Sequence, residues 1–198
     1  MKKDIILAGV GGQGILSIAT MIGVAVVDKG LYVKQAEVHG MSQRGGDVQS
    51  HLRISDQPIY SDLIPMGKAD MIISIEPMES LRYLPYLHPQ TGWLITNSTP
   101  FINISNYPDE EEVKKEIAKI KNHVLINADA IAKDSGNSKA ANMVILGAAS
   151  LHLGIDFDAL KKAIHASFGR KGEDVVNSNI AALEAGRQAA EEYETKHQ

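Results

Sequence analysis

The chain has 198 residues, of which 44% are hydrophobic and 22% are charged, and it contains no cysteine. This composition predicts a globular protein with one domain spanning 1–198, and the formal net charge of −4 disfavours nonspecific binding to nucleic acid. Without cysteine, the sequence excludes disulfides, thiolate catalysis and cysteine-ligated zinc or iron–sulfur clusters within the chain.

The amino-terminal stretch MKKDIILAGVGG joins two lysines to a short apolar run, but Asp4 interrupts the run and a glycine turn ends it. We interpret 4–8 as a first strand rather than as a targeting segment. Every longer apolar stretch is interrupted by Gly, Lys or Asp before it reaches membrane-spanning length. We therefore expect a cytoplasmic protein that does not associate with membranes.

The sequence GVGGQG at 9–14 joins this strand to an apolar helix pattern over 14–29. Its glycines have the spacing G-x-G-x-x-G, which allows a tight turn and a close approach of backbone N–H groups to an anion. The start of the following helix carries about half a positive charge, so a phosphate group is the expected ligand. The alternative is a turn that serves packing alone. The candidate binding residues of this turn are Gly9, Gly11, Gly12, Gln13 and Gly14.

A second candidate loop, EVHGMSQRGGDV at 37–48, follows a predicted strand over 31–38. Two glycines allow the backbone to aim N–H groups at one point, and Arg44 adds a forked donor suited to carboxylate or phosphate. A surface loop in which Arg44 pairs with a nearby acid is the alternative. Glu37, near the end of the strand, suits the ribose contact of a dinucleotide site. The candidate binding residues of this loop are Ser42, Gln43, Arg44, Gly45 and Gly46.

The segment 47–54 alternates polar and apolar residues, which predicts an edge or hairpin strand with one wet face. The short stretch 58–60, beyond the turn SDQP, is its candidate partner. Further strands are predicted at 70–75, 92–97 and 123–127, and further helices at 78–87, 110–121, 138–152, 156–167 and 173–194.

The alternation of apolar runs with helical patterns predicts a three-layer α/β/α fold with a mainly parallel, mixed sheet and a Rossmann-like start. The helix at 138–152 is apolar almost all round, so we expect it to be buried against the sheet or a partner. The last helix ends in EEYETKHQ, which is expected to fray.

No catalytic motif accompanies the two glycine loops. The sequence has no G-x-S-x-G elbow, no His/Glu metal motif and no convincing pair of carboxylates at helical spacing. Its histidines are scattered, without the spacing of metal ligands. We therefore expect neither a catalytic residue nor a metal site in this chain.

Taken together, five stretches resemble the gamma-type subunit of the 2-oxoacid:ferredoxin oxidoreductases. They are GVGGQG, EVHGMSQRGGDVQSHLRIS, IEPMESLRYLP, WLITNS and NMVILGA, and they span most of the chain in the expected order. The form HGMSQRGG resembles the indolepyruvate branch, whereas pyruvate and 2-oxoglutarate relatives tend to carry Y-G-x-x-x-R-G-G. The resemblance implies the fold of the gamma domain, domain III, of pyruvate:ferredoxin oxidoreductase.

The resemblance also implies a division of labour between subunits. A large alpha subunit would hold thiamine diphosphate, magnesium and the iron–sulfur clusters, decarboxylate indolepyruvate or a related 2-oxoacid, pass the acyl group to coenzyme A and reduce ferredoxin. This chain would complete the complex without being catalytic on its own. Its two glycine loops are the candidate site for the phosphates of coenzyme A.

Two other interpretations stay open. One is a self-sufficient oxidoreductase of Rossmann type that binds NAD(P) or a flavin, and the other is an interaction module whose glycine turns are only structural. The glycine loops then contact coenzyme A, another nucleotide or only a partner subunit. In isolation, the chain is expected to expose an apolar surface and to self-associate through the helix at 138–152.

Overall fold

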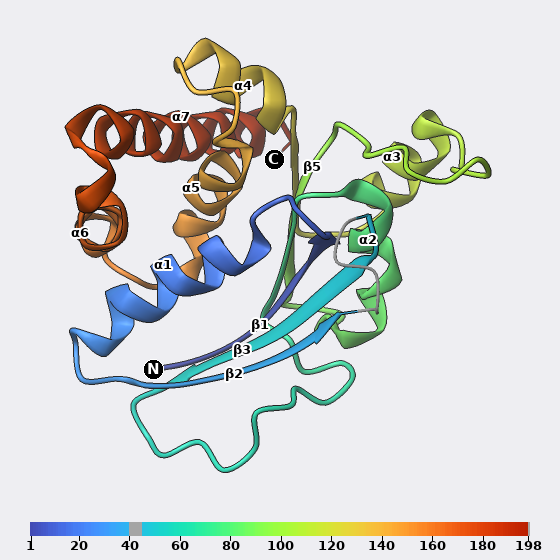
Figure 1. Ribbon diagram of the computed structural model, residues 1–198. Helices are drawn as coiled ribbons and strands as arrows, with labels where there is room; N and C mark the ends of the chain where they lie inside the picture. The colour runs from blue at the N-terminus through green and yellow to red at the C-terminus, as the bar shows by residue number, and fades with distance from the viewer. Residues whose placement is uncertain (40–44, 198) are drawn as a thin grey trace.

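A mixed sheet of six strands lies between two layers of helices in the computed structural model, which describes residues 1–39 and 45–197 (Figure 1). The strand order across the sheet is β2-β3-β1-β4-β5-β6. The strands are β1 (Lys2–Val10), β2 (Tyr32–His39), β3 (Asp47–Ser55), β4 (Met71–Ser74), β5 (Trp93–Asn97) and β6 (His123–Ile126). Strands β1, β4, β5 and β6 are parallel, whereas β3 is antiparallel to both of its neighbours. The predicted α/β fold with a mainly parallel, mixed sheet is confirmed.

The sheet separates two hydrophobic cores because successive side chains of a strand point to opposite faces. In β1, Ile5 and Leu7 belong to the larger core, and Ile6 and Ala8 belong to the smaller one. The larger core is covered by α1 (Ile15–Val27), α4 (Ala128–Asp134), α5 (Ala141–Leu153), α6 (Phe157–Phe168) and α7 (Glu173–His197), with the 3₁₀ turn η2 (Gly169–Lys171) between the last two. The smaller core is covered by α2 (Pro77–Arg82), the 3₁₀ turn η1 (Leu84–Tyr86) and α3 (Glu110–Ala118).

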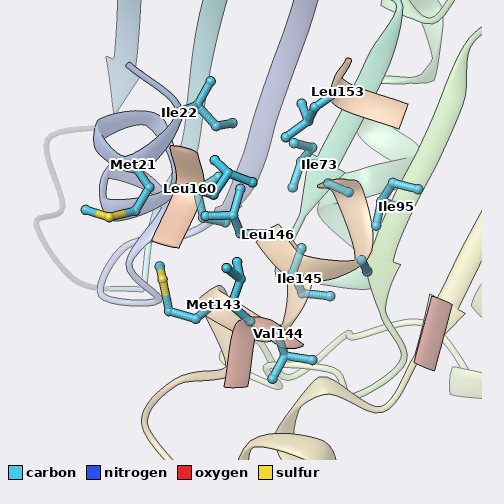
Figure 2. Packing of buried hydrophobic residues seen from close by; sticks show 14 of the residues in the cluster. Met21, Ile22, Ile73, Ile95, Met143, Val144, Ile145, Leu146, Leu153 and Leu160 are labelled. Atoms are coloured by element: carbon cyan, nitrogen blue, oxygen red, sulfur yellow. The ribbon is translucent and has the colours of Figure 1, made fainter. Parts of the chain in front are cut away.

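Helix α5 lies at the centre of the larger layer, and every residue from 143 to 150 is buried. Figure 2 shows Met143, Ile145 and Leu146 of this helix among buried side chains of α1, β4 and β5. Helix α7 packs across its other side. The burial predicted for 138–152 is confirmed for 143–150. Because α7 covers the other side of α5, this helix does not provide the exposed apolar surface expected of it, and self-association of the isolated chain stays a prediction.

Two glycines allow α5 and α7 to come into backbone contact. A Cβ atom on Gly147 would lie 1.9 Å from the carbonyl oxygen of Leu183, and one on Gly186 would lie 2.0 Å from that of Val144. Only a hydrogen atom fits at either position. Helix α7 continues to His197, beyond the predicted end at 194.

The strand predicted at 47–54 is present as β3, but its predicted partner at 58–60 is wrong. It lies inside the sheet between β1 and β2, and no strand forms at 58–60. The polar face of β3, which was expected to be exposed to solvent, is covered by the loop that follows. In this loop, Ile64 donates its N–H to Nδ1 of His51 at 2.9 Å. Arg53 holds the same loop by donating to the carbonyl oxygens of Ser61 and Leu63.

The helices differ from prediction in two places. The predicted helix 78–87 is divided into α2 and η1, because the ring of Pro85 would clash with the carbonyl four residues earlier in a continuous helix. Helix α4 was not predicted; its seven residues follow β6 directly, and the Asn127 side chain caps it by accepting from the N–H of Ala130. Among the helices of the described residues, none is long and apolar enough to cross a membrane.

Candidate functional site

The two predicted glycine loops meet at the carboxyl end of β1. Gly11 donates its N–H to the carbonyl oxygen of Gly46 at 2.8 Å, and Gly45 donates to the carbonyl oxygen of Gly11 at 3.3 Å. The Asn103 side chain donates in turn to the carbonyl oxygen of Gly45. The structure therefore brings the two motifs together, but the N–H groups of Gly11 and Gly45 bind protein carbonyls and do not point to a common ligand.

Gln13 closes the first loop with its side chain and also lines the cleft at the starts of α1 and α5. Its Oε1 accepts from the N–H of Val10 at 2.8 Å, and its own N–H donates to the carbonyl oxygen of the same residue at 3.1 Å. Gly9 is required beside it, because a Cβ atom there would lie 2.9 Å from this Oε1 and 2.7 Å from Cδ1 of Ile15. These two candidate residues form the turn itself.

The remaining N–H donors belong to the first turn of α1. Gly14 begins the helix in the left-handed region with φ 82°, and no side chain of the described residues caps it. The N-cap residue of α5, Ala140, likewise has no side-chain cap among the described residues. Neither first turn contains an acidic residue. Asn142 of α5 links the two ends by donating to the carbonyl oxygen of Gly14 at 3.3 Å. Two uncapped, partly positive helix ends thus lie side by side.

A cleft of about 380 Å³ opens in front of these helix ends. Gly12 lines it from the first loop, Asn97 from the end of β5, and Lys139 and Asn142 from the start of α5. Asp129 stands on the other wall, where its Oδ2 accepts from Nδ2 of Asn97 at 2.8 Å. The cleft lies at the carboxyl edge of the parallel strands, where α/β folds bind their ligands.

Two buried carboxyl groups, of Glu76 and Glu79, and the half-buried carboxyl group of Asp47 lie beside the glycine loops, and none of the three was predicted from the sequence as a site residue. Glu76 is fully buried at the start of α2, where Tyr107 donates its hydroxyl to Oε1 at 2.5 Å and Glu79 donates its N–H to Oε2 at 2.8 Å. Phe101 also donates its N–H to Oε1, at 3.3 Å. Glu76 therefore holds the segment between β5 and α3 over the carboxyl edge of the sheet.

The other two carboxyl groups belong to Glu79 of α2 and to Asp47 at the start of β3, two elements that lie beside each other (Figure 1). Burial raises the pKa of Glu79 to about 7, and the negative charge of Asp47 adds to the rise although Arg82 opposes it. Tyr83 donates its hydroxyl to Oδ2 of Asp47 at 2.6 Å. The E-x-x-E spacing of IEPMES, directly after an apolar strand, was the available sequence signal for these residues.

The family described as "Pyruvate ferredoxin/flavodoxin oxidoreductase" matches residues 4–189. The chain belongs to this family. The indolepyruvate oxidoreductase subunit IorB of Pyrococcus horikoshii is 37% identical, over 97% of this chain and 98% of that protein. The resemblance found in the sequence motifs is confirmed.

Solved structures of this family share the fold. The gamma subunit of a keto/oxoacid ferredoxin oxidoreductase from Geobacter sulfurreducens matches with a TM-score of 0.69 at 24% identity, over 96% of this chain and 99% of that one. The 2-oxoglutarate:ferredoxin oxidoreductase from Magnetococcus marinus, whose structure has coenzyme A bound, matches with a TM-score of 0.75 at 24% identity. That match covers 96% of this chain and 31% of the other.

The family fold also places the remaining predicted site residues. Glu37 lies on β2 at the edge of the sheet, and β3 separates it from β1. A dinucleotide site needs the acidic residue on the strand next to the glycine loop, so Glu37 does not fit that role. Ser42, Gln43 and Arg44 lie outside the described residues. In the described parts of the chain, no three His, Asp or Glu side chains gather as metal ligands.

Proposed function

We propose that this chain is the small subunit of an indolepyruvate:ferredoxin oxidoreductase, acting as one domain in a cytoplasmic complex. The supporting observation is 37% identity to IorB over 97% of this chain and 98% of that protein. The complex would convert an arylpyruvate, coenzyme A and oxidised ferredoxin into an arylacetyl-CoA, carbon dioxide and reduced ferredoxin. The chain contributes structure and binding rather than the reacting groups.

In this proposal, the companion alpha subunit carries thiamine diphosphate, magnesium and the iron–sulfur clusters. The chemistry of the donors supports that assignment, because iron–sulfur clusters are held by cysteine thiolates and this sequence contains no cysteine. Thiamine diphosphate would supply the electron sink for decarboxylation in the companion subunit. The present chain would shape the neighbouring region through which coenzyme A enters.

We further propose that the cleft at the starts of α1 and α5 binds anionic groups of coenzyme A. Gly12 and the first residues of α5 line this cleft, the uncapped start of α1 lies beside it, and Lys139 adds a positive charge. Arg44 of the second loop is expected to add a bidentate contact. Because Gly11 and Gly45 bond to each other's loops, their role is to position these donors.

Reconstitution tests the subunit assignment. The alpha subunit should be assayed for coenzyme A-dependent oxidation of indolepyruvate, pyruvate and 2-oxoglutarate, alone and together with this chain. We expect indolepyruvate oxidation that requires both subunits and exceeds oxidation of the two other acids. Full activity of the alpha subunit alone would contradict the subunit assignment, and preference for another acid would contradict the substrate assignment.

A further inference from the structure

The buried carboxyl groups at the start of α2 are not all satisfied in the same way. Glu76 accepts three hydrogen bonds, which stabilise its negative charge inside the protein. Glu79 is only 4% exposed and accepts from Arg82 alone among donors of the described residues, with Nε at 2.7 Å and Nη2 at 3.4 Å. Burial without further donors favours the neutral form of Glu79.

The neighbouring Asp47 has an incomplete set of hydrogen bonds. Its Oδ2 accepts from the Tyr83 hydroxyl, but its buried Oδ1 has no donor among the residues that the structure describes. Two ionised carboxylates cannot bond to each other, because neither carries a proton. A neutral Glu79 can donate its O–H to Asp47, so one proton would satisfy both groups.

The charged groups on the elements around Glu79 and Asp47 do not neutralise the two carboxyl groups. On α2 itself, Arg82 pairs with Glu79 but its side chain is 53% exposed, so solvent screens it. Tyr83 faces Asp47, and burial beside that carboxylate raises the pKa of its phenol, so it remains a donor. On η1, Tyr86 packs against Tyr83 and His51 and makes no ion pair in the described chain. The adjoining stretches 5–10, 71–74 and 93–97 contain no ionisable side chain.

The position of Asp47 connects the pair to the glycine loops. Asp47 follows Gly46 directly, and the carbonyl oxygen of Gly46 accepts the N–H of Gly11. Any movement of the Asp47 backbone away from α2 therefore pulls on the contact between the two loops.

We propose that Glu79 and Asp47 are positioning residues that share one proton, and that this shared proton holds Gly45 and Gly46 against Gly11 of the GVGGQG loop. When the proton leaves to solvent, two negative charges face each other in a buried site, and the start of β3 moves from α2. The contacts between Gly11 and Gly45 or Gly46 then weaken. The inference concerns the shape of the loops and holds independently of the ligand proposed for the cleft.

Carboxyl ¹³C NMR of the full chain tests the shared proton. The Glu79 signal, assigned by its loss in Glu79→Gln, should titrate with a midpoint near 7 rather than near the ordinary value of 4.5. Asp47→Asn should lower that midpoint by at least one pH unit, which is a tenfold change in proton affinity. An ordinary midpoint in the wild type, or an unchanged midpoint in Asp47→Asn, would overturn the shared proton.

Amide hydrogen exchange tests the positioning role in the same protein. Protection of the Gly11 and Gly45 amides, corrected for the intrinsic dependence of exchange on pH, should fall at least threefold between pH 5.5 and 8.5. Glu79→Gln keeps a donor at every pH, so its protection should stay constant, while Glu116→Gln on the exposed face of α3 should behave as the wild type. Equal protection at both pH values in the wild type would refute the role, and so would an unchanged fall in Glu79→Gln.

Discussion

Glycine serves two different purposes in two regions of this molecule. At the crossing of α5 and α7, Gly147 and Gly186 permit backbone contact, and any larger residue would collide with a carbonyl group. At the carboxyl edge of the sheet, where the two glycine loops meet (the loop edge), Gly12 and Gly45 have φ of 102° and 76°, and a Cβ atom would meet no close neighbour. The comparison indicates that the helix layer supplies stability through packing, whereas the loop edge supplies a backbone shape that leaves N–H groups near the cleft.

The largest effect is expected for Gly147→Ala in the helix layer. The added methyl group would lie 1.9 Å from the carbonyl oxygen of Leu183, so the two helices must separate. We expect the free energy of unfolding to fall by about 3 kcal/mol, measured by urea denaturation. Gly23→Ala is the matched control, because Gly23 lies within α1 with no atom within 4 Å of the added Cβ. It should gain roughly 0.5–1 kcal/mol; equal losses in both variants would break the comparison.

The loop edge should respond to pH where the helix layer does not. Because the folded pKa of Glu79 is about 7 and its ordinary value is 4.5, the folded chain binds more protons than the unfolded chain between these values. The free energy of unfolding should therefore fall as pH rises from 4.5 to 7, by at most about 3 kcal/mol. Urea midpoints of the wild type and Glu79→Gln across this window measure the difference.

The same titrations separate the two regions. Gly147→Ala should lower stability nearly equally at pH 5 and pH 8, since the atoms nearest the added methyl group are backbone atoms of Leu183 and Arg187, which do not titrate. If the free energy of unfolding depends on pH in Glu79→Gln as it does in the wild type, other groups cause the effect and Glu79 does not.

A smaller effect is expected for Gly14→Ala at the start of α1. The left-handed conformation, with φ 82°, costs an alanine about 1–2 kcal/mol, and the new methyl group would lie 2.6 Å from Nδ2 of Asn142. Gly30→Ala is the control, because its φ of 74° gives the same strain without a close neighbour. The excess cost of Gly14→Ala, measured by urea denaturation, should disappear in combination with Asn142→Ala. An excess that persists would place the cause elsewhere.

The sequence predicted β1, β4, β5 and β6 because each is a short apolar run bounded by turn residues or by a helix pattern, and it predicted β3 because its polar and apolar residues alternate. It misplaced β3 because alternation reports a polar face but not what covers that face, and here the loop around Ile64 covers it. The same limit applies to the buried carboxyl groups. Glu76 and Glu79 look like surface residues of a short helix until the segments carrying Tyr107 and Asp47 are placed beside them.

Residue spacing identifies the glycine motifs, but their roles depend on contacts between the loops that spacing does not show. Spacing predicts a turn and nearby N–H groups; it does not show that Gly11 and Gly45 bond to each other's loops. Nor does it show that α5, more than 120 residues later in the chain, begins beside α1 and contributes Asn142. Contacts between distant segments decided which of the candidate donors face the cleft.

Steady-state kinetics of the complex with Lys139→Ala and with Arg44→Ala test whether the glycine loops and the cleft beside them bind anionic groups of coenzyme A in the assembled enzyme. We expect KM for coenzyme A to rise about three- to tenfold in each variant, corresponding to loss of one charge-assisted contact at a partly solvated site. The KM for the 2-oxoacid and the assembly of the complex should not change, and Lys162→Ala on α6 should behave as the wild type. An unchanged KM for coenzyme A in both variants would contradict the claim.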